Sequence, residues 1–282
     1  MAIPIINNWE SYFHHPDEGM GSSYERVILN DILLEIVKRY QIDSVLESPA
    51  FGFTGLSGIN LMELARQGIR ISLEDHDASR LELIRDLWSQ AQLSLDSRFN
   101  PDYTKLDYPD KSFGMSFSFS ALWFCQNLRA YLQELARVSS RCILISVPNR
   151  QGLGYQSQLQ DYSPARYPEL KPAHIDPPSI VSILSKTGWE LKRSALFDCP
   201  PWPDIGMSKE DFLERKLGIR LARKQVEAAK SNPPLCIMDH YLDKDPGFPE
   251  RMRRLAFVEK HAPQAFKRIW AHHYYMLFEP GG

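Results

Sequence analysis

Short apolar runs alternate with helical patterns between residues 42 and 198 of this chain. In the helical segments apolar residues recur every three or four positions, whereas the short runs, such as RCILISVPN at 141–149, place apolar residues close together over a few positions. This alternation is typical of a parallel β-sheet that helices cover on both faces. It predicts strands at 43–48, 69–75, 112–120, 141–149 and 189–197, a later strand at 272–280, and helices at 27–40, 58–68, 78–91, 127–138 and 177–188.

Residues at the ends of the predicted helices support these boundaries. Asn127 precedes one helix and can cap it through its side-chain oxygen. Asp176 can cap another, whose first position is Pro177, where the N–H that proline lacks would have been unpaired anyway. Gly68 follows the helix at 58–68, where a left-handed backbone is common. The pattern therefore predicts helix ends as well as helices.

Composition excludes several classes of protein. The 282 residues are 43% hydrophobic and 24% charged with a net charge of −2, so no basic surface for nucleic acid is expected. No apolar run approaches the roughly 20 residues that cross a bilayer, and the N-terminus lacks the features of a secretion signal. The four cysteines form no C-x-x-C pair, so no metal site is expected. We expect a cytoplasmic protein whose partner is a small molecule, with no membrane span.

Three segments carry a family pattern. The most specific is "LDYPDKSFGMSFSFSALWF" at 106–124, where an acid-rich loop and a P-D-x-S-F turn lead into a strand. The second is "RISLEDHD" at 70–77, in which acids follow a strand. The third is the order of elements towards the C-terminus: a helix, a strand, an insertion and a last strand. Together these segments resemble the class I S-adenosylmethionine-dependent methyltransferases over residues 42–198 and 269–280.

The resemblance implies a fold and a division of the chain. The fold is α/β: a Rossmann-like, doubly wound, mostly parallel seven-stranded sheet with a helical insertion before the last strand. Its implied cofactor is S-adenosylmethionine. The implied parts are an N-terminal cap segment at 1–41, the core at 42–198, the insertion at 199–268, and the last strand of the core at 269–282.

The loop after the first strand departs from the family's pattern. The family places glycines after the acid of this strand, but here Glu47 is followed by Pro49 and Phe51. Glycines occur later, so a longer turn is predicted that meets the methionine part of the cofactor at Gly52 and Gly55. Since S-adenosylmethionine has no phosphate, the N–H that proline removes matters less than in a dinucleotide site. In the alternative, which stays open, Pro49 and Phe51 fill the groove and the pocket is vestigial.

Further cofactor contacts are implied at the ends of the next strands. Asp75 is expected to accept hydrogen bonds from the ribose hydroxyls, with a solvated acidic turn as the alternative. Asp102 matches the acid that approaches the adenine amino group, and Tyr103 can lie on the adenine face. Ser118 lies at the end of the fourth strand, where the methyl group is displayed. The expected cofactor-binding residues are Glu47, Gly52, Gly55, Asp75, Asp102, Tyr103 and Ser118.

The sequence does not identify the methyl acceptor. A general base is needed only if the accepting atom is protonated at neutral pH. The candidates for that base or for a substrate contact are Tyr24, His15, Tyr155 and His174.

The insertion at 199–268 carries 14 Lys or Arg against 10 Asp or Glu. Ser208 and Asp211 can begin a helix by reciprocal capping, and we expect a helical cap that helps to close the substrate pocket. A surface or dimerisation element is an equally open interpretation, and a homodimer stays open with it. The residues expected to face the pocket are Trp202, His240 and Tyr241.

Two functions from different classes follow. The favoured one is a methyltransferase acting on a small-molecule acceptor. The other is a protein that keeps the methyltransferase fold and binds a ligand or partner without methyl transfer, as the unusual loop suggests. A nicotinamide-dependent oxidoreductase comes third, because the G-x-G-x-x-G motif is missing.

Overall fold

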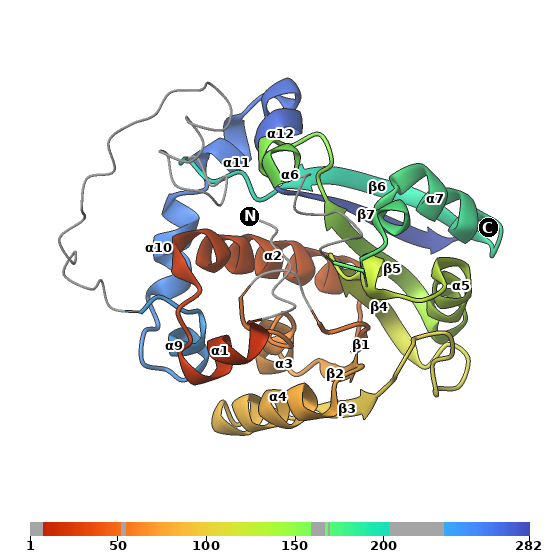
Figure 1. Ribbon diagram of the computed structural model, residues 1–282, viewed down its shortest axis with the longest axis horizontal. Coiled ribbons are helices and arrows are strands. Elements are labelled where there is room, and N and C mark those ends of the chain that lie inside the picture. Colours follow the sequence, from red (N-terminus) through yellow and green to blue (C-terminus); the bar gives the residue numbers. More distant parts are fainter. Residues whose placement is uncertain (1–7, 52–54, 159–166, 169, 203–233) are drawn as a thin grey trace.

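The computed structural model describes residues 8–51, 55–158, 167–168, 170–202 and 234–282. Within them one seven-stranded sheet has the order β3-β2-β1-β4-β5-β7-β6 (Figure 1). Only the pairings of β7 with β5 and with β6 are antiparallel. The predicted doubly wound, mostly parallel sheet is confirmed. The strands are β1 (Ser44–Glu47), β2 (Arg70–Asp75), β3 (Asp96–Phe99), β4 (Phe113–Phe119), β5 (Ser139–Pro148), β6 (Trp189–Phe197) and β7 (His273–Pro280).

The central strands match the apolar runs of the sequence. Every residue of β1 and of β4 is buried, because helices cover both faces of the sheet. Val45 pairs with Ile71 on one side and with Met115 on the other, which places β1 at the centre. The edge strand β3 was not located from the pattern, since its four residues are polar except for one and none is buried.

Two layers of helices enclose the sheet (Figure 1). One apolar core joins the sheet to α2 (Gly19–Tyr40), α3 (Met62–Arg66), α4 (Ala78–Gln90) and α10 (Phe248–Arg254). The other joins it to α5 (Leu128–Val138), α6 (Leu153–Gln158) and α7 (Pro177–Ser185), with the short 3-10 turns η1 (Leu122–Phe124) and η2 (Pro172–Ile175).

The predicted helix caps are present. The side chain of Asn127 accepts a hydrogen bond from the N–H of Ala130, and that of Asp176 accepts one from the N–H of Ser179. Gly68 has a φ of +83° and follows Gln67, the C-cap residue of α3. The helix predicted at 58–68 begins only at Met62, because Gly58 adopts a φ of +75° and packs so closely on Ile84 that a Cβ would lie 2.7 Å from its side chain.

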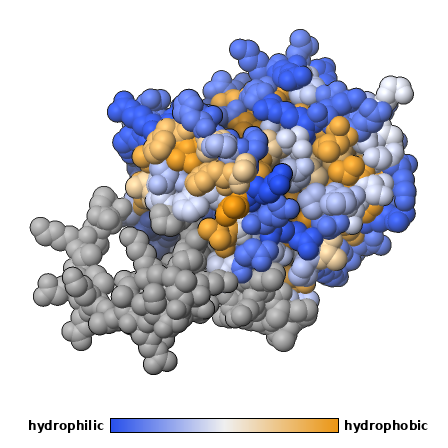
Figure 2. Space-filling model, turned by 90° about the horizontal axis from the view of Figure 1, so that it is seen from above, coloured by the Kyte–Doolittle hydropathy of each residue, from blue (hydrophilic) through white to orange (hydrophobic). Residues whose placement is uncertain are grey.

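The described part of the insertion is helical. It contains α9 (Met238–Tyr241), α10, α11 (Phe257–His261) and α12 (Gln264–Trp270), while a short α1 (Trp9–His14) opens the chain. The helix expected to begin at Ser208 lies outside the described residues. Apolar residues gather in separate patches among polar ones on the face shown in Figure 2. Among the helices that the structure describes, none combines the length and the apolar character needed to cross a membrane.

Candidate functional site

Buried acids lie at the carboxyl ends of β1 and β2. Glu47, the last residue of β1, is 1% exposed, and its Oε1 accepts a hydrogen bond from Nδ2 of Asn60. Its Oε2 is buried without a hydrogen-bond partner among the described residues. Burial raises the pKa of Glu47 to about 8, although Asn60 and the Arg26 guanidinium oppose the shift. This end of β1 therefore holds a buried carboxyl oxygen without a hydrogen-bond partner among the described residues.

Asp75, the last residue of β2, is held by Arg80. The Nε atom of Arg80 lies 2.9 Å from Oδ2 of Asp75, and its Nη2 donates to Oδ1. The guanidinium also lies 3.9 Å from the ring centroid of Phe51 and 4.9 Å from that of Trp9. Both charged side chains are almost fully buried. The oxygens expected to accept ribose hydroxyls are thus engaged by a neighbour five residues along the chain.

Glu74 points to the other side of β2 from Asp75. Its Oε2 accepts hydrogen bonds from Ser48 Oγ at 2.9 Å and from Asn100 Nδ2 at 3.1 Å. Burial raises the pKa of Glu74 to about 7, and both hydrogen bonds oppose the shift. Asn100 also accepts the N–H of Tyr103, so Glu74 supports the loop that carries Tyr103.

The predicted adenine contacts have separate surroundings. Tyr103 is 1% exposed, with a φ of +57°, and its hydroxyl lies 2.8 Å from Nδ1 of His76. Asp102 is exposed and accepts two hydrogen bonds from Thr104. Ser118 is fully buried within β4. Only Tyr103 therefore packs beside the acids of β2.

The loop after β1 binds a carboxylate of the protein itself. Oε1 of Glu18 accepts the N–H of Leu56 at 2.8 Å and lies 3.0 Å from Nη2 of Arg26. Gly55 has a φ of +62°, and a Cβ there would collide with the Glu18 carboxylate. Arg26 also donates to Asn60, the partner of Glu47. Gly55 thus lies where a carboxylate meets a backbone donor and an arginine, while Gly52 lies outside the described residues.

A pocket of about 1010 Å³ opens on the opposite lateral side of the sheet from β2 and β3. It lies between the end of β5, α6, the start of α7, β6 and α12, and its lining is mixed polar and apolar. Arg150, one of its residues, lies 3.0 Å from Asp176. Its lining includes Asn149, Arg150, Tyr155, Arg268 and Tyr274.

The four proposed catalytic residues do not come together. Tyr155 lines the pocket, His15 is exposed, and His174 is half-buried in η2. Tyr24 is fully buried on α2, where burial and then the Glu259 carboxylate raise the pKa of its hydroxyl. The structure therefore supports no joint role for this set.

The insert residues expected at the pocket lie in the opposite helix layer. The ring of Trp202 packs edge-on against Tyr24, with 5.6 Å between centroids. Tyr241 accepts a hydrogen bond from Asn30, and Nε2 of His240 lies 3.4 Å from a carboxylate oxygen of Glu63 on α3. None of the three lines the pocket described above, because the described insert helices α9 and α10 pack on α2 and α3.

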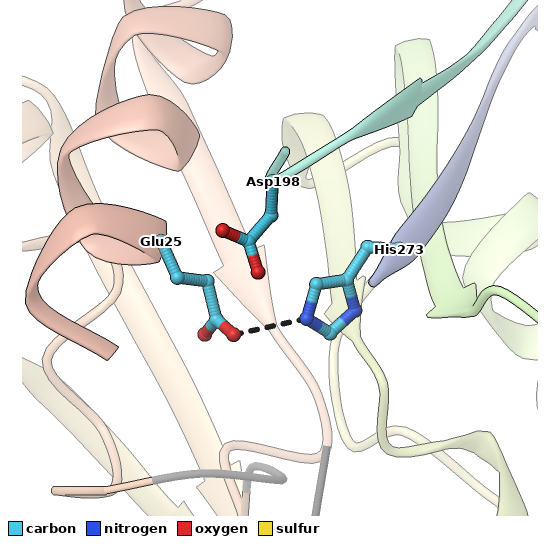
Figure 3. A group of neighbouring side chains, drawn as sticks. All are labelled: Glu25, Asp198 and His273. Carbon is cyan, nitrogen blue, oxygen red and sulfur yellow. Dashed lines mark hydrogen bonds and ion pairs between the residues drawn. The ribbon is translucent and has the colours of Figure 1, made fainter. Parts of the chain in front are cut away.

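Sequence reasoning missed the residues that complete these groups. Glu18 and Arg80 carry no motif, since each acts through a contact made only in the fold. A further buried group, formed by Glu25, Asp198 and His273, also went unnoticed (Figure 3). Its members lie far apart in the sequence, so no spacing indicates them.

Comparison with known proteins identifies a family model and several solved structures that this chain is similar to. Residues 53–141 match the family model described as a methyltransferase domain. Similar solved structures include a protein from Galdieria sulphuraria named as a sarcosine dimethylglycine methyltransferase, with 15% identity, a TM-score of 0.53, and 89% and 85% of the two chains covered. A chain from the complex of the Haloferax volcanii Trm112 methyltransferase activator with a methyltransferase has 14% identity, a TM-score of 0.54 and 98% coverage of both chains. A protein from Bacillus halodurans, described as a methyltransferase, has 12% identity, a TM-score of 0.50, and 90% and 99% coverage. No curated protein matches the sequence significantly.

Proposed function

We propose, starting from the class I methyltransferase domain that this chain carries, that it transfers a methyl group to a small-molecule acceptor. S-adenosylmethionine is the cofactor that such a domain implies, and it supplies an electrophilic methyl group on a sulfonium. The observation that carries the proposal is the family match over residues 53–141, which begins in the loop after β1 and spans β2 and β4. The resemblance read from the sequence is thereby confirmed.

The loop after β1 fits the methionine end of this cofactor. A carboxylate is already bound there by the N–H of Leu56 and by Arg26. The buried carboxyl group of Glu47 lies nearby, and burial keeps it protonated at neutral pH. A bound ammonium group would favour the ionised form of Glu47, whose Oε2 would then accept a hydrogen bond from it. In this arrangement the Glu18 carboxylate occupies donors that the ligand's carboxylate would use.

The ribose of the cofactor fits only if side chains beside Asp75 move. Two ribose hydroxyls would need the oxygens of Asp75, which Arg80 holds. Arg80 would turn away and Phe51, which stacks on it, would move with it. Because an unpaired buried charge is strongly unfavourable, this exchange would reduce the net gain from the ribose contacts.

The pocket beside β5, β6 and β7 is our candidate for the acceptor site. Its volume of about 1010 Å³ is within the range of small-molecule sites, which run to roughly 1,000 Å³. Arg268 lies exposed at its edge on α12 and would favour an anionic acceptor. Tyr155 and Tyr274 provide ring faces on which a planar or apolar part can lie.

In this proposal the protein acts mainly by positioning the reactants. Methyl transfer is an in-line displacement, so fixing the accepting atom and excluding water lowers the barrier without a strong general base. Tyr155 would orient the acceptor, and the buried strand ends would keep water from the reacting atoms.

The test uses S-adenosylmethionine with a radiolabelled methyl group and a cell extract separated into metabolites, protein and nucleic acid. We expect label in the metabolite fraction only when the chain is present. Label in protein or nucleic acid would refute a small-molecule acceptor. Once the acceptor is isolated, Arg268→Gln should raise its KM several-fold without changing S-adenosylhomocysteine affinity, whereas Arg251→Gln, on α10 outside the pocket, should change neither.

A second function is favoured by one observation. The Asp75–Arg80 pair and the stacked Phe51 fill the ribose side of the groove, as expected of a protein that keeps the fold and binds a ligand or partner without methyl transfer. Calorimetry with S-adenosylhomocysteine separates the two: binding supports the methyltransferase, and no heat at millimolar ligand supports the second function. A cytoplasmic location and a homodimer stay predictions.

A further inference from the structure

A buried group of donor atoms lies where β4 and β6 end and β7 begins. Glu25 comes from α2, Asp198 follows β6, and His273 begins β7 (Figure 3). All three side chains point into the same small space, and one ligand atom from each lies within 4.8 Å of the others. None of the three is more than 1% exposed.

We propose that Glu25, Asp198 and His273 form a binding site for one divalent first-row transition-metal ion. The site is independent of the proposed methyl transfer, since none of its residues belongs to the cofactor loop or to the pocket beside α6 and α12.

The distances suit such an ion. Oε2 of Glu25 lies 3.0 Å from Nε2 of His273. Two ligand atoms held about 2.1 Å from an ion lie about 3.0 Å apart at the right angle of an octahedral site and about 3.4 Å apart at the tetrahedral angle that Zn²⁺ prefers, so the observed separation is at the short end of this range. Asp198 needs only a small side-chain movement to complete the set, because its ligand atom is already within 4.8 Å of both.

Neighbouring groups orient these ligands as in known metal sites. Oγ of Ser120 lies 3.1 Å from Nδ1 of His273, which fixes the ring with Nε2 facing Glu25. Nδ1 of His272 lies 2.6 Å from Oδ2 of Asp198. A histidine that binds a metal usually gives its other nitrogen to such a partner, and a bound carboxylate is usually hydrogen-bonded in turn.

The charge of the group also favours a cation. The Glu259 carboxylate lies next to this group and accepts the N–H of Cys199. An ion that replaces the proton between Glu25 and His273 would add positive charge where buried acids converge.

The donor set selects the kind of ion. Imidazole nitrogen favours Zn²⁺ and Fe²⁺ over Ca²⁺ and Mg²⁺, which prefer all-oxygen sites, while the two carboxylates also suit Mn²⁺. No thiolate belongs to the set, so soft ions have no advantage. Among these ions Zn²⁺ should bind more tightly than Mn²⁺, as the usual affinity order requires.

The test is metal binding by the full chain after treatment with a chelator, without cofactor. Calorimetry should show one Zn²⁺ bound per chain, with Mn²⁺ weaker and Mg²⁺ weaker still. His273→Gln should weaken Zn²⁺ binding by at least about a hundredfold, and Ser120→Ala, which removes only the orienting contact, by about tenfold. His240→Gln is the matched control, because it removes a histidine beside another acid, Glu63, and should leave Zn²⁺ affinity unchanged.

Two results would overturn the proposal. One is a parent protein that binds neither Zn²⁺ nor Mn²⁺ at millimolar concentration. The other is Zn²⁺ affinity that survives His273→Gln but falls in His240→Gln. If circular dichroism shows that His273→Gln does not fold, Co²⁺ is added to the parent protein and its absorption spectrum is recorded. Bands from d–d transitions without a thiolate charge-transfer band support the site. A charge-transfer band, or no spectral change, refutes it. Since no cofactor is present, failure here leaves the proposed methyl transfer untouched.

Discussion

Two polar regions at the carboxyl ends of the strands are built in opposite ways. In the region at β1 and β2, Asp75 pairs with Arg80, which lies five residues further along the chain. Asp75 ends β2, and Arg80 lies in the first turn of the next helix, α4. In the region at β6 and β7, Glu25, Asp198 and His273 come from three distant parts of the chain. The first is a local ion pair in which each charge neutralises the other. The second exists only once β7 has inserted between β5 and β6.

The difference teaches how to interpret buried acids in this fold. Acids at the end of one strand can be located from the sequence, but their availability depends on neighbours such as Arg80. Acids and histidines brought together by topology cannot be located in advance, because their partners come from distant parts of the chain. Three substitutions sharpen this contrast.

The largest effect is expected for Arg80→Met. It leaves the Asp75 carboxylate buried and unpaired, which should lower the free energy of unfolding by about 3–5 kcal/mol in chemical denaturation. Arg80→Met with Asp75→Asn should recover much of the loss, since no buried charge then lacks a partner. Arg85→Met, on the exposed face of the same helix, is the control and should change stability by less than about 0.5 kcal/mol. An equal loss in the single and double variants would contradict a self-contained local pair. Asp75→Ala alone is therefore expected to destabilise the fold as well as to remove a ribose contact.

An intermediate effect that depends on pH is expected for Glu47→Gln. Burial raises the pKa of Glu47 to about 8 in the fold, so the folded chain holds this proton while the unfolded chain has lost it. The parent therefore loses stability as pH rises from about 4.5 to 8, and the loss is constant above that range. Glu47→Gln keeps an oxygen for Asn60 and lacks the titration, so it should be more stable than the parent by ~2 kcal/mol or more at pH 8 and equal to it at pH 4.5. Denaturation curves at both pH values measure this; a difference between the two proteins that does not grow with pH would show that Glu47 is already ionised.

The smallest effect is expected for Glu18→Gln. Its charge competes with a ligand carboxylate for Leu56 and Arg26, so the substitution should tighten S-adenosylhomocysteine binding about tenfold, or roughly 1.4 kcal/mol. Asp17→Asn is the control in the same segment, since Asp17 contacts Gly19 and Leu235 rather than the loop. Calorimetric titration compares the variants. Weaker binding in Glu18→Gln than in Asp17→Asn would mean that Glu18 supports the loop rather than blocking it.

Much of the fold could be predicted because nearly all of its helices and strands are marked by sequence patterns that span only a few residues. The strands predicted at 43–48, 112–120 and 189–197 match β1, β4 and β6 within a residue, and the caps Asn127 and Asp176 are present. The misses have local causes too. The strand β3 is polar because it lies at an edge, and Gly58 delays the start of α3 because its left-handed backbone packs on Ile84.

Less of the site could be predicted. Glu47, Asp75 and Tyr103 do lie at adjacent strand ends, as their positions along the chain implied. The catalytic candidates Tyr24, His15, Tyr155 and His174 were chosen by residue type, and the fold separates them. Residue type alone does not indicate which side of a sheet a loop will reach.

The sequence by itself determined the sheet, its helical layers and the acids at the strand ends, because hydrophobic periodicity and capping act between residues a few positions apart. Only the tertiary structure decided which residues contact those acids. Arg80 engages Asp75, Glu18 reaches the loop after β1 from the N-terminal segment, and His273 meets Glu25 across 248 residues of chain. The physical reason is that a buried charge is stabilised by whatever partner the packing brings within hydrogen-bonding distance, and packing joins parts of the chain whose separation no local pattern records.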